Sequence, residues 1–173
     1  MTILRRQDEH VDVLMLGDNL LVAPGRTITD PRLGHLDIPE RHLYKQRLAT
    51  GTGFDDTHRG LLVALQRKQA ARRNRPGGYW IAETDPAAAY QGIRATIPVD
   101  QIPWAIVATD GAYTPMEHLG ITDWPTISSA SAADLDGILM QCHAWERDHD
   151  PDARHLPRAK RHDDEALAIG RFT

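Results

Sequence analysis

Two aspartates stand at opposite ends of two apolar segments of the chain. Asp110 follows residues 104–109, and Asp163 precedes residues 165–169. If these segments are neighbouring antiparallel strands, both carboxylates reach the same edge of one sheet. Converging carboxylate oxygens suit a hard divalent cation such as Mg²⁺ or Mn²⁺. Gly111 fits this interpretation, because a residue without a Cβ lets the chain turn sharply beside a bound ion.

The residues just before Asp163 could bind a substrate phosphate and protonate its leaving group. Arg158, Lys160 and Arg161 could hold its oxygens, and His162 could act as an acid toward the leaving group. A plainer interpretation stays open for each: a solvated basic loop and a structural histidine. An Asp-Gly pair after a strand is also typical of an ordinary turn.

The composition predicts one domain spanning residues 1–173. Of these 173 residues 41% are hydrophobic, which is enough to build a core. The net charge of −4 gives no reason to expect nucleic acid or a membrane surface as a partner. The one cysteine, Cys142, excludes an intrachain disulfide and is expected to be a packed core thiol. Without a membrane-length apolar run or a signal peptide, the chain is predicted to be cytoplasmic.

Apolar patterns and turn residues predict a mixed order of strands and helices. Residues 11–16 and 20–23 form an expected hairpin, and a turn at Pro24-Gly25 leads to 27–29. Residues 31–53 are expected to be a connection with one short helix.

Two helices have clear starting signals in the second part of the chain. The first can be capped by Asp55, Asp56 or Thr57 and has a basic end, and the longest runs from Ser131 to about residue 147. We further expect strands at 79–83, 104–109 and 165–169, a helix at 86–94 and irregular structure at 114–130. The class is therefore α+β.

Five segments carry a family resemblance in the family's own order. They are residues 14–22, 29–33, 73–80, 108–111 and 162–168. They look like a strand ending in Gly-Asp-Ser, a Thr-x-Asp segment, an Arg-x-Asn-x-Pro-Gly-Gly-Tyr-Trp segment, a Thr-Asp-Gly metal motif and a closing Asp-Asp metal motif. The chain thus resembles the protein phosphatase 2C type of metal-dependent serine/threonine phosphatase, in its compact actinobacterial form.

The resemblance implies an α-β-β-α sandwich of antiparallel sheets. It also implies hydrolysis of phosphoproteins by water activated on two Mn or Mg ions. Asp110 and Asp163 match two metal ligands, Gly111 contributes through its backbone, and Asp164 matches a neighbouring position that orients the site through hydrogen bonds. Asp18 matches the Gly-Asp-Ser aspartate, which we interpret as a structural turn.

One section of the family pattern has no counterpart. The acidic Glu-Asp segment and the central Asp-Gly motif, whose aspartate bridges the two metals, would precede residue 1. We therefore expect the C-terminal part of such a domain, with Mn or Mg bound weakly or not at all, and a bare sheet edge that promotes self-association. Three hypotheses follow: an impaired phosphatase, an inactive module that binds a protein or phosphoprotein partner, or a nonfunctional gene fragment.

Overall fold

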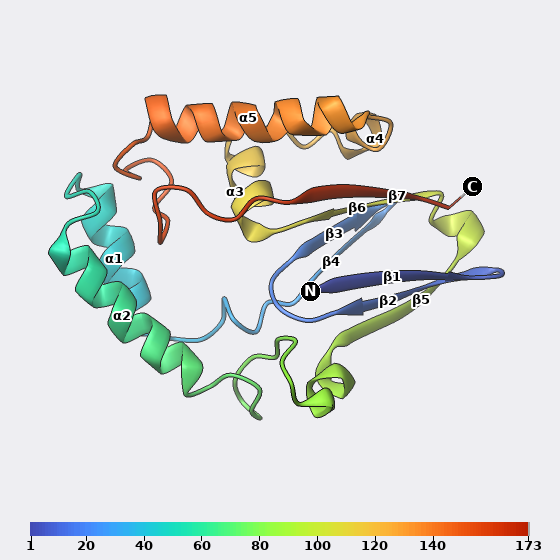
Figure 1. Ribbon diagram of the computed structural model, residues 1–173, viewed down its shortest axis with the longest axis horizontal. Helices are drawn as coiled ribbons and strands as arrows, with labels where there is room; N and C mark the ends of the chain where they lie inside the picture. The colour runs from blue at the N-terminus through green and yellow to red at the C-terminus, as the bar shows by residue number, and fades with distance from the viewer. Residues whose placement is uncertain (173) are drawn as a thin grey trace.

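The computed structural model describes residues 1–172 and has the predicted α+β class. Its strands form two antiparallel sheets with helices around them (Figure 1). One sheet has the order β1-β2-β5 and contains Thr2–Gln7, His10–Met15 and Ile93–Pro98. The other has the order β4-β3-β6-β7; in chain order its strands are Leu20–Ala23 (β3), Arg26–Thr29 (β4), Trp104–Ala108 (β6) and Leu167–Arg171 (β7).

The two sheets pack face to face around one hydrophobic core. Every second residue of β2 points into this core: Val11, Val13 and Met15 are at most 3% exposed. They pack with Leu21 of β3 and Ala105 of β6. The alternation of apolar and polar residues along β2 therefore fixes which side of the strand faces the second sheet.

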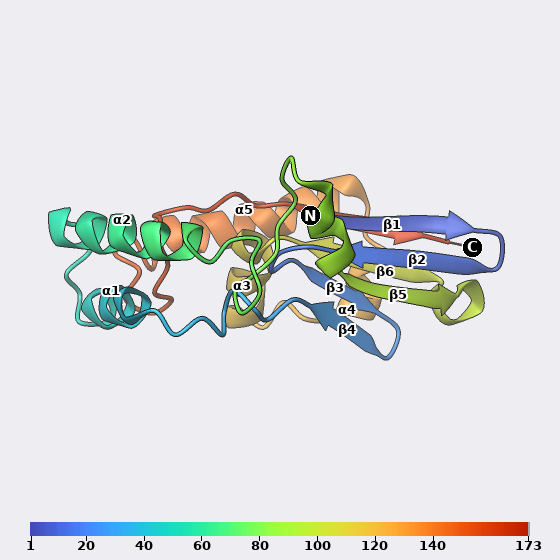
Figure 2. The same ribbon diagram turned by 90° about the horizontal axis from the view of Figure 1, so that it is seen from below.

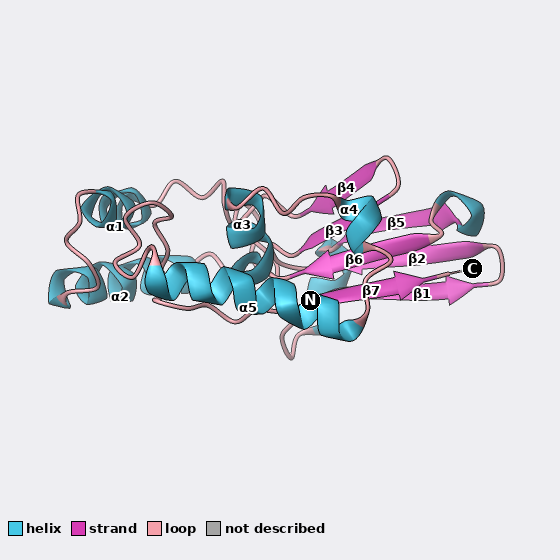
Figure 3. Ribbon diagram, turned by 90° about the horizontal axis from the view of Figure 1, so that it is seen from above, coloured by secondary structure: helices cyan, strands magenta, loops and turns pink. Residues whose placement is uncertain are grey.

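Helices cover the outer face of the four-stranded sheet (Figure 3). Ile106 of β6 packs against Met116, Ile127 and Cys142, which come from α3 (Asp110–His118), α4 (Trp124–Ile127) and α5 (Ala132–Asp148). The predicted capping box at Ser131 begins α5, and Cys142 is fully buried, so both predictions are confirmed. Among residues 1–172, none of the helices has both the length and the apolar character needed to cross a membrane.

A helical arm, formed by α1 (Pro39–Ala49) and α2 (Asp56–Ala70), lies beyond one end of the sheets (Figure 2). Tyr44 and Leu48 of α1 pack with Leu65 of α2 in a cluster separate from the sheet core. Of the three candidate caps of α2, Asp55 is the cap, since its Oδ1 accepts a hydrogen bond from the backbone N–H of His58 at 2.7 Å. The short helix expected within 31–53 is α1.

The predicted hairpin of residues 11–16 and 20–23 is wrong. These segments are β2 and β3, which belong to different sheets. Between them Leu16 donates its N–H to the carbonyl of Met1, and Gly17 donates to the carbonyl of Trp80, both at 2.9 Å. These bonds hold the connection between β2 and β3, where the chain crosses from the three-stranded sheet to the four-stranded sheet instead of forming a hairpin. Residues 11–16 form the central strand of their sheet, because β1 and β5 flank β2, so the edges of that sheet are β1 and β5.

Three further predictions of elements need correction. The strand expected at 79–83 is a loop with a single bridge between Arg73 and Tyr79. The helix expected at 86–94 is a 3-10 helix, η1 (Pro86–Gln91), after which β5 begins at once. The irregular stretch expected at 114–130 contains most of α3 and all of α4.

Candidate functional site

The pairing of β6 with β7 brings Asp110 and Asp163 to one end of the sandwich, as the sequence predicted. The strands are antiparallel, with Ala108 opposite Leu167. Thr109 extends the contact past the last strand pair: its Oγ1 donates to the carbonyl of Asp164 and accepts from the N–H of Ala166, both at 2.9 Å. This clasp fixes the segment that carries Asp163 against the start of α3.

Both carboxylates line one cavity of about 190 Å³. We call it the acidic pocket. Its walls come from α1, α3, α5 and the loop of residues 149–166, and they include Tyr44, Lys45, Gly111, Thr114 and Arg158. Since the helical arm supplies one wall, the pocket depends on tertiary packing as well as on the two strands.

Gly111 is needed for a different reason from the one predicted. It lies within the first turn of α3 rather than in a sharp turn beside an ion. A Cβ at this position would lie 2.6 Å from the carbonyl oxygen of Asp164 and 3.0 Å from the Cβ of Asp163. The absent side chain therefore lets the Asp163 segment approach α3 closely.

The electrostatics of Asp110 reveal a third acidic group. Burial raises the pKa of its carboxyl, and the charges of Asp18 and Asp163 raise it further. Tyr113 of α3 also reports this proximity: burial, Asp18 and Asp110 raise its pKa to about 12. Asp18 was interpreted from sequence as a structural turn, yet its carboxylate acts on the same group as Asp163. Its place in the Gly-Asp-Ser-like segment was the signal that could have identified it.

Lys160 forms an ion pair with Asp163, the second carboxylate of the acidic pocket. Lys160 Nζ lies 2.6 Å from Asp163 Oδ1, and the pKa of this lysine is raised mainly by that hydrogen bond. The side chain of Asp164 does not have the orienting role that the sequence predicted for it. Its carboxylate is fully exposed, and its backbone is the part that orients the site, through the bond to Thr109 and an N–H donated to Asp163 Oδ1 at 2.8 Å.

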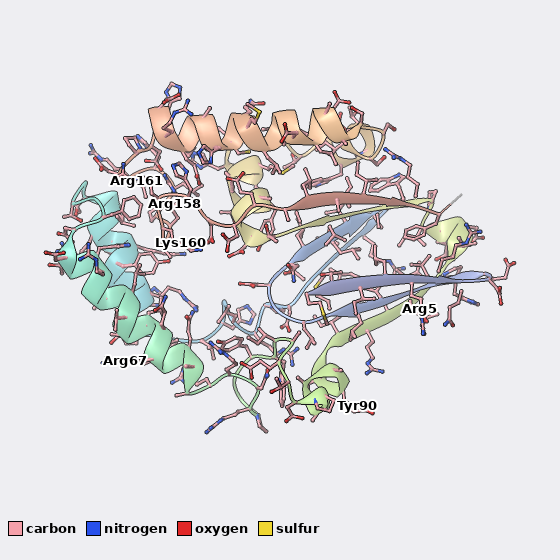
Figure 4. All side chains as sticks on the ribbon, in the orientation of Figure 1. Arg5, Arg67, Tyr90, Arg158, Lys160 and Arg161 are labelled. Atoms are coloured by element: carbon pink, nitrogen blue, oxygen red, sulfur yellow. The ribbon has the colours of Figure 1, made fainter. Side chains whose placement is uncertain are left out.

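Arg158 is committed to buried carboxylates rather than left free for a phosphate. Its Nη1 contacts Asp150 Oδ2 at 2.8 Å, and its Nε lies 3.3 Å from Glu146 Oε1. Burial alone would raise the pKa of Asp150, but hydrogen bonds from two backbone N–H groups and from Arg158 hold that pKa low. Arg161 lies apart, with its guanidinium 5.8 Å from the centroid of the Phe54 ring. Figure 4 shows Arg158, Lys160 and Arg161 grouped between α5 and the helical arm.

His162 faces α5. Its Nδ1 lies 2.9 Å from Glu146 Oε2, and its ring stacks on His143 with centroids 3.9 Å apart. It is not among the residues that line the acidic pocket. These contacts give His162 a structural place beside the pocket, and the role of leaving-group acid predicted for it has no geometric support here.

Tyr44 is a residue of the pocket that sequence reasoning missed. Burial raises the pKa of its hydroxyl, and Asp163 and Asp110 raise it further, so the phenol lies within the field of both carboxylates. Nothing in the local pattern of α1 separates Tyr44 from an ordinary core aromatic. Only the packing of the arm against the end of the sheets shows its relation to the acidic pocket.

The donor set fits one weakly held hard cation better than a two-metal centre. The oxygens of Asp110 and Asp163 are ligands of the kind that Mg²⁺ and Mn²⁺ accept. A cation there would also offset the repulsion between Asp110 and the carboxylates of Asp18 and Asp163. Within residues 1–172, however, no three His, Cys, Asp or Glu side chains are arranged to hold one metal ion. Comparison of the chain with models of known families and with curated proteins finds no match.

Proposed function

We propose that this chain is a phosphatase-like module of the metal-dependent protein phosphatase 2C type, with weak affinity for Mn or Mg and little hydrolytic activity. The supporting observation is that Asp110 and Asp163, far apart in sequence, line one cavity at the end of two packed antiparallel sheets. The substrate class under this proposal is a phosphoprotein, and the location is the cytoplasm. The α-β-β-α family fold is part of the same proposal.

The chemistry follows from the charges in the acidic pocket. A bound Mn or Mg ion would lower the pKa of a water molecule and offset charge on phosphoryl oxygens. Asp110 and Asp163 would hold the ion, and Lys160 must release Asp163 Oδ1 before that oxygen can serve as a ligand. Lys45 and Tyr44 stand on the opposite wall, where their donors can meet phosphoryl oxygens.

Low activity follows from the small number of ligands. Two carboxylates hold Mg²⁺ or Mn²⁺ only with help from several waters or a substrate phosphate. The ammonium of Lys160 competes with the ion for Asp163, and no bridging carboxylate completes a two-metal centre within the described residues. The same facts favour the second candidate, an inactive phosphatase-like module that binds a protein or phosphoprotein partner.

Phosphatase assays on the purified chain test the proposal. With a phosphothreonine peptide and Mn²⁺, we expect slow hydrolysis that disappears on chelation and in Asp163→Asn. Asp164→Asn is the matched control, because its carboxylate points into solvent and should leave the rate unchanged. Robust turnover would contradict the impaired site, and Mn-independent turnover would contradict the site itself. No hydrolysis by any variant would leave the binding module as the function.

A further inference from the structure

A second cavity, of about 510 Å³, opens where three segments far apart in sequence meet. They are the loop after β4, the loop between α2 and η1, and the end of η1. Residues lining it include Arg32, His35, Gly77, Gly78, Trp80 and Gln91. The lining thus combines an indole, an imidazole and a guanidinium with exposed backbone. Such a mixture suits a ligand with both a flat or apolar part and an anionic group.

Arg32 is held in place before any ligand arrives. Its Nε donates to Asp30 Oδ1 at 2.8 Å, and its Nη2 donates to Asp30 Oδ2 and to the carbonyl of Gln91. Asp30 is only 3% exposed, so the carboxylate end of this bidentate pair is buried, while the side chain of Arg32 is 31% exposed. Within residues 1–172, Nη1 of Arg32 has no hydrogen-bond partner in the structure, which leaves one donor for an anion at the cavity wall.

The loop that forms the opposite wall is also fixed. A Cβ at Gly78 would lie 1.8 Å from the carbonyl oxygen of Arg72, so the two backbones are in direct contact. Asn74 has a φ of 49°, and its side chain accepts from the N–H of Ile81 at 2.8 Å and donates to Glu83 at 3.1 Å. Asn is among the residues that adopt this conformation most readily, and these hydrogen bonds hold the loop in one shape.

The surface beside this cavity is basic, although the whole chain carries a net charge of −4. Residues 67–80 contain five Arg or Lys and no Asp or Glu. Lys68 is paired with Glu40, and Arg73 with Glu83. Within residues 1–172 the other three basic side chains, Arg67, Arg72 and Arg75, are exposed and make no ion pair. In Figure 4, Arg67 lies toward one end of α2, the end that is farther from Lys160 and Arg161.

We propose that this cavity, together with the exposed arginines of residues 67–80, binds an acidic peptide segment of a partner protein. Charge complementarity selects an acidic ligand, and Nη1 of Arg32 can donate a hydrogen bond to a carboxylate oxygen. The cavity wall is tied to the sheets, because the carbonyl of Trp80 accepts from the N–H of Gly17. The whole chain carries a net charge of −4, which gives no general attraction to a continuous phosphate backbone, whereas a short acidic peptide needs only this local group of arginines. The site therefore suits a peptide better than nucleic acid.

Fluorescence anisotropy with a dye-labelled, glutamate-rich peptide tests this site. The buffer contains a chelator, so the measurement does not depend on the metal chemistry of the proposed function. We expect Arg75→Glu, which reverses an exposed charge beside the cavity, to weaken binding about fivefold. Trp80→Phe, which keeps an aromatic ring in the half-buried position, should also weaken it. Arg59→Glu is the control: it is 76% exposed and lies roughly 20 Å away along α2.

The expected result is binding that falls with salt, is absent for a lysine-rich peptide, and stays within about twofold in Arg59→Glu and Asp110→Asn. An equal loss in Arg59→Glu would overturn the site, since it would mean general attraction to charge. Equal binding of a neutral peptide would overturn the role of the arginines. Tighter binding of single-stranded RNA than of the peptide would assign the surface to nucleic acid instead.

Discussion

At the scale of single residues, Gly111 sets how closely the loop of residues 149–166 approaches α3. A Cβ there would be 2.6 Å from the carbonyl oxygen of Asp164. We expect Gly111→Ala to lower the free energy of unfolding by about 1–3 kcal/mol. Gly137→Ala in α5 is the matched control, because nothing lies within 4 Å of its added Cβ, and it should stabilise by about 0.5–1 kcal/mol. Equal thermal melts of the two variants would contradict the close contact.

Asp110 should make stability depend on pH. Its folded-state pKa is raised by burial, Asp18 and Asp163, so the folded protein binds this proton more tightly than the unfolded chain. The carboxyl therefore costs stability once the pH exceeds its unfolded pKa. In metal-free buffer Asp110→Asn should stabilise the protein at neutral pH by up to about 1 kcal/mol. Urea unfolding should show this gain shrinking as the pH falls, and a gain independent of pH would argue against the carboxylate cluster.

At the scale of elements, the loop of residues 149–166 depends on Arg158. Removing this cation would leave Asp150, which is 2% exposed, without its charge partner, and would leave Glu146, which is 3% exposed, with only His162 beside it. Arg158→Met should therefore cost about 3–5 kcal/mol in a denaturant titration. Arg161→Met, which removes an exposed cation stacked on Phe54, should cost less than about 1 kcal/mol. A stable Arg158→Met protein with weaker phosphate binding would restore the role predicted from sequence.

The low pKa of Asp150 adds a pH dependence to the same element. A carboxyl with a depressed folded-state pKa stabilises the protein above its unfolded pKa, and that stability is lost as the pH falls through the folded value. The wild type should therefore lose stability in acid. In an acid titration Asp150→Asn, which keeps a hydrogen-bonding side chain, should lose less than the wild type. An identical acid response in both proteins would rule out this contribution.

Elements with local signals could be predicted from the sequence, and elements defined by distant partners could not. Ser131 and Asp55 mark the starts of α5 and α2, because their side chains cap these helices. Ile93, Ala95 and Ile97 also alternate with polar residues, but the helix start at Asp85 led us to extend the helix as far as residue 94. β5 is defined by its pairing with β2, which is distant in sequence. The false hairpin arose because short apolar runs do not show which sheet each strand joins.

The candidate site divides in the same way. The shared edge of Asp110 and Asp163 follows from strand order alone, so sequence could predict it. The ion pair of Lys160 with Asp163 and the position of Tyr44 depend on how a loop and the helical arm pack. No pattern within either segment shows those contacts.

At the scale of the whole molecule, one sheet face is uncovered. Among residues 1–172 no α-helix lies over the outer face of the three-stranded sheet (Figure 1); the short η1 lies at one end of it, and Ile3 is 45% exposed. Exposed apolar surface and free strand edges favour association. Light scattering should show a mass that rises with protein concentration, and Ile3→Lys should reduce that rise. A wild type that stays monomeric at every concentration would contradict this expectation.

The central claim is that Asp110 and Asp163 together can hold a divalent cation, and Mn²⁺ titration by calorimetry tests it most directly. The wild type should bind Mn²⁺ weakly, and Asp110→Asn should lose that binding. Lys160→Met should bind more tightly than the wild type, because the competing ammonium is gone from Asp163. Asp164→Asn should match the wild type. No Mn²⁺ binding by the wild type and Lys160→Met, or equal binding by Asp110→Asn, would contradict the claim.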